Sequence, residues 1–207
     1  VNGDNDYEYA AGITFALNKT ASQYTIREKD GFEIVFDSNG LLVEKRDLHG
    51  NNISYTYDAD YKIETMSDGQ GKTFTFNYNS NDQVASVTSS DNQTVYYSYY
   101  NDGDDNGTSD DLKAFTDLEN HETQYEYIVD SDDGFNNHNL KKYTLPESEQ
   151  DYLEIHYYKN DQVSHHTNST GKRFDFQYSV KNQYTETWNE EGYYRKVFFN
   201  DSGDVTR

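Results

Sequence analysis

Residues 53–71 read ISYTYDADYKIETMSDGQG, and this stretch alternates large and polar side chains, breaks at Asp58 and then resumes. Nearly the same phrase returns as FTFNYNSNDQVASVTSSDN at residues 74–92 and as FDFQYSVKNQYTETWNEEG at residues 174–192. Alternation with a period of two places one set of side chains on one face of a β-strand. The small polar residues between the two runs favour a tight reversal, so each phrase predicts one β-hairpin.

The phrase belongs to an internal repeat that covers most of the chain. Its phase is set by the second large residue of each pair, here called the marker: Phe36, Tyr57, Tyr78, Tyr99, Tyr127, Tyr157, Tyr178 and Phe199, at spacings of 21, 21, 21, 28, 30, 21 and 21. A strand-forming residue precedes each marker by two positions: Ile34, Tyr55, Phe76, Tyr97, Tyr125, Ile155, Phe176 and Val197. An apolar or aromatic residue follows six positions later, or thirteen in the two long repeats: Leu42, Ile63, Val84, Leu112, Leu140, Val163, Tyr184 and Val205.

Turn residues close the repeats. DSNG at residues 37–40 is the clearest turn, because Asn-Gly tolerates the positive φ that such reversals need. The closing residue of a repeat is Gly or Asn: Gly50, Gly71, Asn92, Asn120, Gly171 and Gly192. The sequence therefore predicts an all-β fold, a repeat array of antiparallel β-hairpins with a period of about 21 residues that forms a long, twisted and coiled meander sheet, as an open shell or half-barrel.

The array is expected over residues 24–207, in about eight repeats, with insertions at residues 100–111 and 128–139. Residues 1–23 alternate with an imperfect phase, and they are expected to form a degenerate repeat or a cap.

The pair Tyr57-Asp58, preceded by Tyr55 and followed by Ile63 and Gly71, resembles the YD repeat of the RHS superfamily. This superfamily includes bacterial Rhs and wall-associated proteins, the B and C components of insecticidal Tc toxins, and teneurins. The resemblance covers residues 24–207, although only the Tyr57 and Phe36 repeats keep Asp after the marker. It implies hairpins that coil into a hollow shell around a toxin. A second interpretation is a small secreted bacterial protein that uses similar hairpins for an open half-barrel.

The composition excludes several function classes. With 17 Lys and Arg against 38 Asp and Glu, the net charge is −21, which repels nucleic acids and anionic membranes. No apolar run approaches the length of a membrane span, so membrane insertion is not expected. The absence of Cys excludes disulfides and thiolate metal sites. Aromatic residues make up 16% of the chain, about half of its 33% hydrophobic share, as expected for half-buried pleated surfaces.

The ends of the sequence predict the partners. The chain begins at Val1 without Met, as a mature or excised piece would, and it stops two residues after Val205, inside a predicted strand. An unpaired strand edge invites another strand. The expected partners are therefore the rest of a longer chain or further copies of this one.

The first insertion predicts a calcium site. Asp102, Asp104 and Asn106 offer oxygen ligands at alternate positions, Gly107 allows a bend, and Asp110 or Asp111 follows. Lys113 stands where an EF-hand needs Glu, so the predicted loop is a shorter one on a hairpin tip. The second insertion adds Asp130, Asp132 and Asp133, and as the tip of the next repeat it is expected to lie beside the first. The alternative is that both tips are solvated acidic loops.

Other site signals are few. The sequence has no motif of a hydrolase, metalloprotease or phosphate-binding loop, and no catalytic residue or enzymatic activity is predicted. His165 and His166 are neighbours in a predicted strand and point to opposite faces, so they do not share a metal ion. Trp188 interrupts the repeat pattern and is the candidate for stacking on a sugar ring, whereas the periodic Tyr residues are expected to form structural pairs.

The predicted function is a non-catalytic structural segment, a shell, stalk or scaffold, of a secreted or surface-displayed bacterial protein. Two alternatives remain open. One is an extracellular carbohydrate-binding or adhesive module that uses Trp188. The other is a self-assembling extracellular filament subunit that joins copies through open strand edges. All three place the chain outside the cell or at its surface.

Overall fold

The computed structural model describes residues 6–7, 15–129, 137–146 and 152–206. The chain divides into two compact units, residues 1–95 and 96–207. The strands of the first unit are β1 (Asp6–Tyr7), β2 (Phe15–Lys19), β3 (Gln23–Glu28), β4 (Glu33–Asp37), β5 (Leu42–Arg46), β6 (Asn52–Tyr57), β7 (Ile63–Ser67), β8 (Thr73–Tyr78) and β9 (Val84–Ser89). β10 (Thr94–Tyr99) begins at the end of the first unit, and the second unit continues with β11 (Leu112–Thr116), β12 (Glu122–Tyr127), β13 (Leu140–Thr144), β14 (Leu153–Tyr157), β15 (Val163–Asn168), β16 (Arg173–Ser179), β17 (Tyr184–Asn189) and β18 (Tyr194–Phe198).

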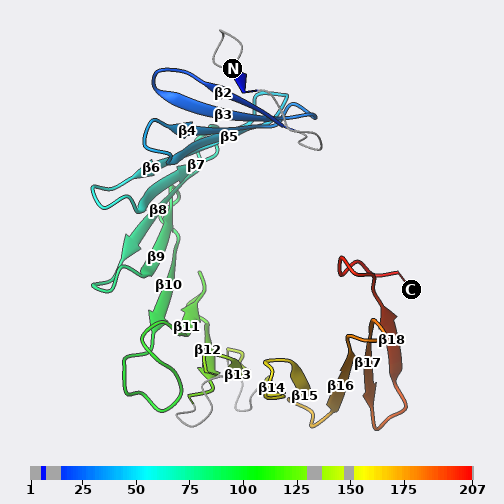
Figure 1. Ribbon diagram of the computed structural model, residues 1–207. Helices are drawn as coiled ribbons and strands as arrows, with labels where there is room; N and C mark the ends of the chain where they lie inside the picture. The colour runs from blue at the N-terminus through cyan, green and yellow to red at the C-terminus, as the bar shows by residue number, and fades with distance from the viewer. Residues whose placement is uncertain (1–5, 8–14, 130–136, 147–151, 207) are drawn as a thin grey trace. The chain divides into compact units, whose positions relative to one another are not determined.

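Both units are antiparallel meanders. In the first unit each strand from β1 to β9 pairs with the next strand along the chain. In the second unit the same holds from β10 to β18 (Figure 1). The described residues contain no helix. The predicted all-β sheet of hairpins is therefore confirmed, and its two-residue alternation explains why no helical period appears in the sequence.

The marker residues fix the register of the hairpins. Seven of the eight markers lie at or beside the end of the first strand of their hairpin and pair with the apolar residue six or thirteen positions later: Phe36 with Leu42, Tyr57 with Ile63, Tyr78 with Val84, Tyr99 with Leu112, Tyr127 with Leu140, Tyr157 with Val163, and Phe199 with Val205 in an isolated bridge. The two long repeats keep this pairing, so their extra residues lie wholly in the turn.

A β-bulge precedes the marker in six hairpins, those of Phe36, Tyr57, Tyr78, Tyr99, Tyr127 and Tyr157. In the Tyr57 hairpin, for example, Thr56 pairs with Thr65 while Tyr57 pairs with Ile63, which leaves Glu64 as the extra residue. Such a bulge increases the local twist of the ladder. The repeat pattern did not reveal it, because the spacing of six is compatible with either register.

The Tyr178 hairpin departs from this pattern. Here Tyr178 pairs with Thr185 and Ser179 pairs with Tyr184, without a bulge. The left-handed residue of the turn is Gln183, five positions after the marker, whereas it is Tyr61, four positions after the marker, in the Tyr57 hairpin. The sixth-position residue Tyr184 is thereby opposite Ser179, on the other face of the sheet from the marker, because one residue of slip reverses side-chain direction.

The predicted turn closers are confirmed by their backbone. Gly50, Gly71, Asn92, Asn120, Gly171 and Gly192 all have positive φ, between 60° and 103°. Asn adopts this left-handed conformation more readily than most side chains do, which explains why Asn92 and Asn120 replace Gly here.

The sheet has two chemically different faces. The aromatic face carries the markers and the residues two positions before them, and the polar face carries the residues between. Side chains on the aromatic face are mostly half-buried, and among the described residues only Val35, Tyr100, Gly107, Asp111 and Ala114 are buried. Neighbouring hairpins therefore shield the aromatic face only in part, and none of the described strands forms a second layer over it within either unit.

The ring contacts expected across strands are found in the second unit. Tyr97 packs on Phe115 with ring centroids 5.4 Å apart, and Tyr143 packs on Tyr152 at 5.2 Å. In the first unit the partners are mixed, as in the pairs of Tyr55 with Met66 and of Met66 with Phe74. The proposed boundary between a cap at residues 1–23 and the array stays a prediction, and the antiparallel pair of β2 and β3 has an unbroken register without the bulge.

Candidate functional site

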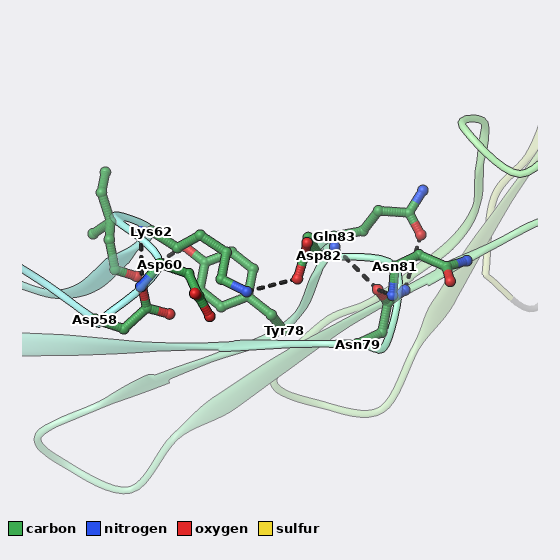
Figure 2. A network of polar contacts seen from close by, with 9 residues as sticks. Asp58, Asp60, Lys62, Tyr78, Asn79, Asn81, Asp82 and Gln83 are labelled. Carbon is green, nitrogen blue, oxygen red and sulfur yellow. Dashed lines mark hydrogen bonds and ion pairs between the residues drawn. The ribbon is translucent and has the colours of Figure 1, made fainter.

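The turn that follows a marker is organised by one side-chain oxygen. Asp58 Oδ1 accepts the backbone N–H groups of Asp60 and Lys62, both at 2.9 Å (Figure 2). Asp37, Asn79 and Asn200 do the same in their turns. In this way an Asx side chain provides a hydrogen-bond acceptor for turn N–H groups that do not pair with a neighbouring strand. The Asp of the Tyr57-Asp58 pair is therefore a turn-forming residue.

The opposite turns contain the same device, which the sequence analysis missed. Asp68 Oδ1 accepts the N–H groups of Gln70 at 2.8 Å and Lys72 at 3.0 Å. The equivalent acceptors, each bound to two amides, are Asp47, Asp117 and Asn168. Hydrogen bonds from its turn, above all from the His121 amide, lower the pKa of Asp117. The missed signal was an Asx residue eleven positions after the marker, or eighteen positions after it in the long repeat that contains Asp117.

Successive turns are also linked to one another. Lys62 Nζ contacts Asp82 Oδ1 in the next marker turn at 2.6 Å and lies 5.1 Å from the Tyr78 ring centroid (Figure 2). The Asp82 hydrogen bond raises the pKa of Lys62. On the other edge, Lys172 Nζ contacts Glu191 at 2.9 Å. Such exposed ion pairs contribute little stability individually, but they align neighbouring repeats.

Marker tyrosines join each hairpin to the one before it. The hydroxyl of Tyr57 donates to the carbonyl oxygen of Leu42 at 2.7 Å, and that of Tyr78 donates to Ile63 at 2.8 Å. Tyr157 donates to Leu140 at 2.8 Å. Burial raises the pKa of all three hydroxyls, which keeps them protonated as donors. This contact explains why Tyr is preferred to Phe at the marker.

The described parts of the two insertions are in contact, whereas residues 130–136 of the second lie outside the described residues. His138 from the second insertion places Nδ1 3.0 Å from Asp111 Oδ1 of the first. The other oxygen of Asp111 accepts from the Thr108 amide at 2.9 Å and lies 3.2 Å from the Thr108 hydroxyl. Asp111 is only 6% exposed, so these donors compensate its burial. An imidazole therefore faces this carboxylate.

Aromatic packing anchors the first insertion. Tyr100 is 8% exposed, and its hydroxyl donates to the Tyr125 carbonyl at 2.7 Å. A Cβ at Gly107 would lie 2.2 Å from the Tyr100 ring, so the close approach needs Gly at this position. The bend that suggested a metal loop is therefore also a packing requirement. Burial, followed by the charge of Asp111, raises the pKa of nearby Tyr127 to about 12.

The predicted calcium ligands are only partly gathered. Asp102 Oδ1 lies 3.4 Å from the Ser109 amide, and Asp104 Oδ2 accepts from the Asn101 amide at 2.9 Å. Asp130, Asp132 and Asp133 lie outside the described residues. Within the described ranges, no three His, Asp or Glu side chains are arranged to hold a metal ion. Calcium binding by Asp102, Asp104, Asn106, Asp110 and Asp111 stays a prediction.

Trp188 lies in a continuous row across five strands. The ladder aligns His156, His165, Asp175, Trp188 and Tyr194 as successive partners on the polar face. Other repeats place Ser, Thr or Arg at the Trp188 position: Arg46, Ser67, Thr88, Thr116, Thr144 and Thr167. Sugar binding by Trp188 stays a prediction, and the row adds a second aromatic residue to it, since Tyr194 is 59% exposed.

The sequence analysis also missed a pair of histidines in this row. His165 and His166 do face opposite sides, as predicted. His166 packs on Phe174, at 5.3 Å, and on Phe176. His165 stacks instead on His156 of the adjacent strand, with ring centroids 4.2 Å apart. Their spacing of nine residues is the signal, because the residue before a marker pairs with the one nine positions later in the bulged hairpins that have no insertion.

No helix among the described residues is long and apolar enough to cross a membrane. No protein-family model and no curated protein matches the chain.

Solved structures do match it. The crystal structure of TcdB2-TccC3-TEV has a TM-score of 0.51 at 10% identity, and the match covers 93% of this chain and 12% of that chain. The crystal structure of TcdB2-TccC3-Cdc42 has a TM-score of 0.47 at 10% identity, over 92% of this chain and 13% of that chain. The Photorhabdus luminescens Tc holotoxin pore has a TM-score of 0.39 at 13% identity, over 88% of this chain and 9% of that one.

The first similarity shows a shared fold. The chain has the fold of one part of a Tc toxin chain. It spans 12% of that chain's length, and at 10% identity no residue role is transferred.

Proposed function

We propose that the chain is a non-catalytic structural segment of an RHS-type protein, one stretch of hairpin wall within a longer extracellular or surface-displayed polypeptide. The observation that carries this proposal is the repeat itself. The same Asx turns recur from hairpin to hairpin, and three Tyr hydroxyls join one hairpin to the hairpin before it. Chemistry at a single site does not require such repetition, whereas a wall of equal elements does.

The incomplete burial of the aromatic face supports a wall with a covered side. Phe74 is 36% exposed and Tyr152 is 43% exposed, although both belong to cross-strand pairs or ring contacts. Apolar surface of this kind marks a place where further protein packs. The shared fold with a Tc toxin chain that is several times longer supports the same interpretation.

The test uses single cysteines in a segment that contains none. Phe74→Cys reports on the aromatic face and Thr75→Cys, its matched control, on the polar face of the same strand. In the isolated 207-residue chain, a bulky maleimide is expected to label both. In the natural full-length polypeptide the Phe74→Cys thiol is expected to be protected, because further protein covers the aromatic face, whereas the Thr75→Cys thiol still reacts. Labelling is scored by mass spectrometry of the peptide that contains the cysteine. Equal labelling in the natural protein, or a natural polypeptide no larger than 24.1 kDa, would refute the wall proposal.

A carbohydrate-binding module is the second candidate, favoured by the row in which Trp188 lies between Asp175 and Tyr194. Aromatic rings beside carboxylates provide the stacking and hydrogen bonding that sugars need. On a glycan array with and without calcium, Trp188→Ala is expected to abolish binding while Tyr61→Ala, an exposed ring in the first unit, leaves it unchanged. No bound glycan under either condition removes this candidate. The filament alternative predicts polymerisation that depends on protein concentration.

A further inference from the structure

Three of the six histidines lie in one hairpin, that of β14 and β15. His156 and His165 are direct partners in the ladder on the polar face, and their rings are nearly parallel, at 11°, with centroids 4.2 Å apart. At the same register position the Tyr57 hairpin holds Thr56 and Thr65, whose hydroxyl oxygens lie 2.7 Å apart and hydrogen-bond. Stacked imidazoles offer no hydrogen bond of this kind, and they repel each other when both carry a proton.

Charged groups flank this stacked pair on both sides. Glu154 Oε1 lies 3.4 Å from His156 Nε2, so it can serve as the counter-charge of that ring. Asp175 is the ladder partner of His165 on β16, but the Arg173 guanidinium binds its carboxylate at 2.6 Å. Burial, followed by the charges of His156 and Arg173, lowers the pKa of His165, and the two carboxylates do not cancel this effect. A second proton on the pair therefore meets repulsion that one carboxylate does not offset.

His166 faces the other side of the same strand, among aromatic rings. Its ring packs on Phe174 and Phe176, with centroids 5.3 and 5.4 Å away. Its Nδ1 is buried and has no hydrogen-bond partner among the described residues. The titratable groups on this face of the adjoining strands are Tyr157 and Tyr178, and because burial raises the pKa of both hydroxyls, neither is negatively charged at neutral pH. A proton on His166 would therefore place an uncompensated charge among these rings, and burial lowers the pKa of this imidazole accordingly.

The ladder that joins this hairpin to β13 is short. Among the described residues it holds two residue pairs, whereas the corresponding ladder between β7 and β8 holds three. Lys142 of β13 is the partner of Glu154 in one of the two pairs, and it also contacts Glu126 at 2.9 Å. We propose that the β14–β15 hairpin is an acid-responsive element of the second unit, closed when its imidazoles are neutral and locally open when they are protonated. This property belongs to the chain by itself and does not depend on the wall proposal.

The direction of the response follows from the protons that each state binds. In the open state the imidazoles are in water, where their pKa is about 6.5. The closed state binds fewer protons, because the pKa of His165 and the pKa of His166 are lowered there. The open state is therefore favoured as the pH falls through about 6.5. Between pH 7.5 and 5.5, each of the two groups increases the open fraction by up to about tenfold.

Hydrogen exchange of the whole chain tests this opening. Exchange is followed by mass spectrometry at pH 7.5 and 5.5 and corrected for the intrinsic exchange rate at each pH. The amides of β14 and β15 are expected to lose protection at the lower pH, by about threefold to a hundredfold. The hairpin of β8 and β9, residues 73–89, is the internal control, because it has the same bulge and no histidine. Its protection is expected to change by less than about twofold.

Matched variants remove the titration while copying another hairpin of the same chain. His156→Thr together with His165→Thr recreates the hydroxyl pair of the Tyr57 hairpin. His166→Met copies Met66, which occupies the same register position there. The triple variant is expected to show equal protection of β14 and β15 at both pH values.

His49→Gln, which removes an exposed turn histidine, is the control substitution and is expected to leave the wild-type response unchanged. The comparison of the two wild-type hairpins decides the proposal even where a variant does not fold. A β14–β15 hairpin that responds no more than the β8–β9 hairpin, or a folded triple variant that still responds, would overturn the proposal and assign the three histidines a packing role.

Discussion

Replacing Tyr57 by Phe tests the hydroxyl contacts between hairpins. The change removes one hydrogen bond, from the Tyr57 hydroxyl to the Leu42 carbonyl at 2.7 Å, and leaves the ring in place. A bond of this kind contributes a net 0.5–1.5 kcal/mol, so the expected loss is about 1 kcal/mol. With an m-value of about 2 kcal/mol/M, the urea midpoint is expected to fall by about 0.5 M.

Tyr55→Phe is the matched control for that experiment. Tyr55 lies two positions earlier on the same strand and the same face, and its ring pairs with Met66 across the ladder. Its hydroxyl makes no hydrogen bond like that of Tyr57, so the midpoint is expected to stay within about 0.1 M of wild type. Both variants are unfolded in urea and followed by circular dichroism. Equal losses in the two variants, or no loss in Tyr57→Phe, would show that the contact does not join the hairpins.

Four further outcomes are expected. Asp68→Ala leaves two turn amides without their acceptor and is expected to cost about 1 kcal/mol in urea unfolding, whereas Asp68→Asn keeps the acceptor and most of the stability. Burial lowers the pKa of His166, so the unfolded state binds more protons and stability falls as the pH drops below about 6.5; His166→Phe is expected to flatten the slope between pH 7 and 5.5, and an unchanged slope contradicts the assignment. The pKa of Tyr127 is raised to about 12, so its contribution is complete below pH 10 and is lost as the pH rises toward 12; Tyr127→Phe is expected to make alkaline unfolding less steep. If the first insertion binds calcium, millimolar Ca²⁺ raises the melting midpoint of the wild type but not of Asp104→Asn, and an unchanged wild-type midpoint ends that prediction.

The strands were predictable because one rule governs them all. A large residue every second position, repeated every 21 residues, identifies both strands of a hairpin, and small polar residues identify the reversals. The positive φ of Gly71 and Asn92 followed from the residue type alone. These features depend on neighbours within a few positions along the chain.

What escaped prediction depends on register. The bulge before Tyr57 and the unbulged turn before Tyr184 give the same sequence spacing, so only the ladder distinguishes them. The stacking of His156 on His165 follows from that ladder and was hidden for the same reason. The contact of Asp111 with His138 joins two insertions 27 residues apart, beyond the reach of a pattern within one repeat.

The pairing of Tyr99 with Leu112, and of Tyr127 with Leu140, has a consequence for how such chains change by insertion and deletion. Extra residues at the marker turn project from the edge and leave the alignment of both strands intact, so this position accepts segments of many lengths. A single deletion inside β6 or β8 would instead exchange the two surfaces of that strand. Length variation is therefore expected to accumulate along one border of the ribbon, which makes that border the natural place to graft a foreign peptide.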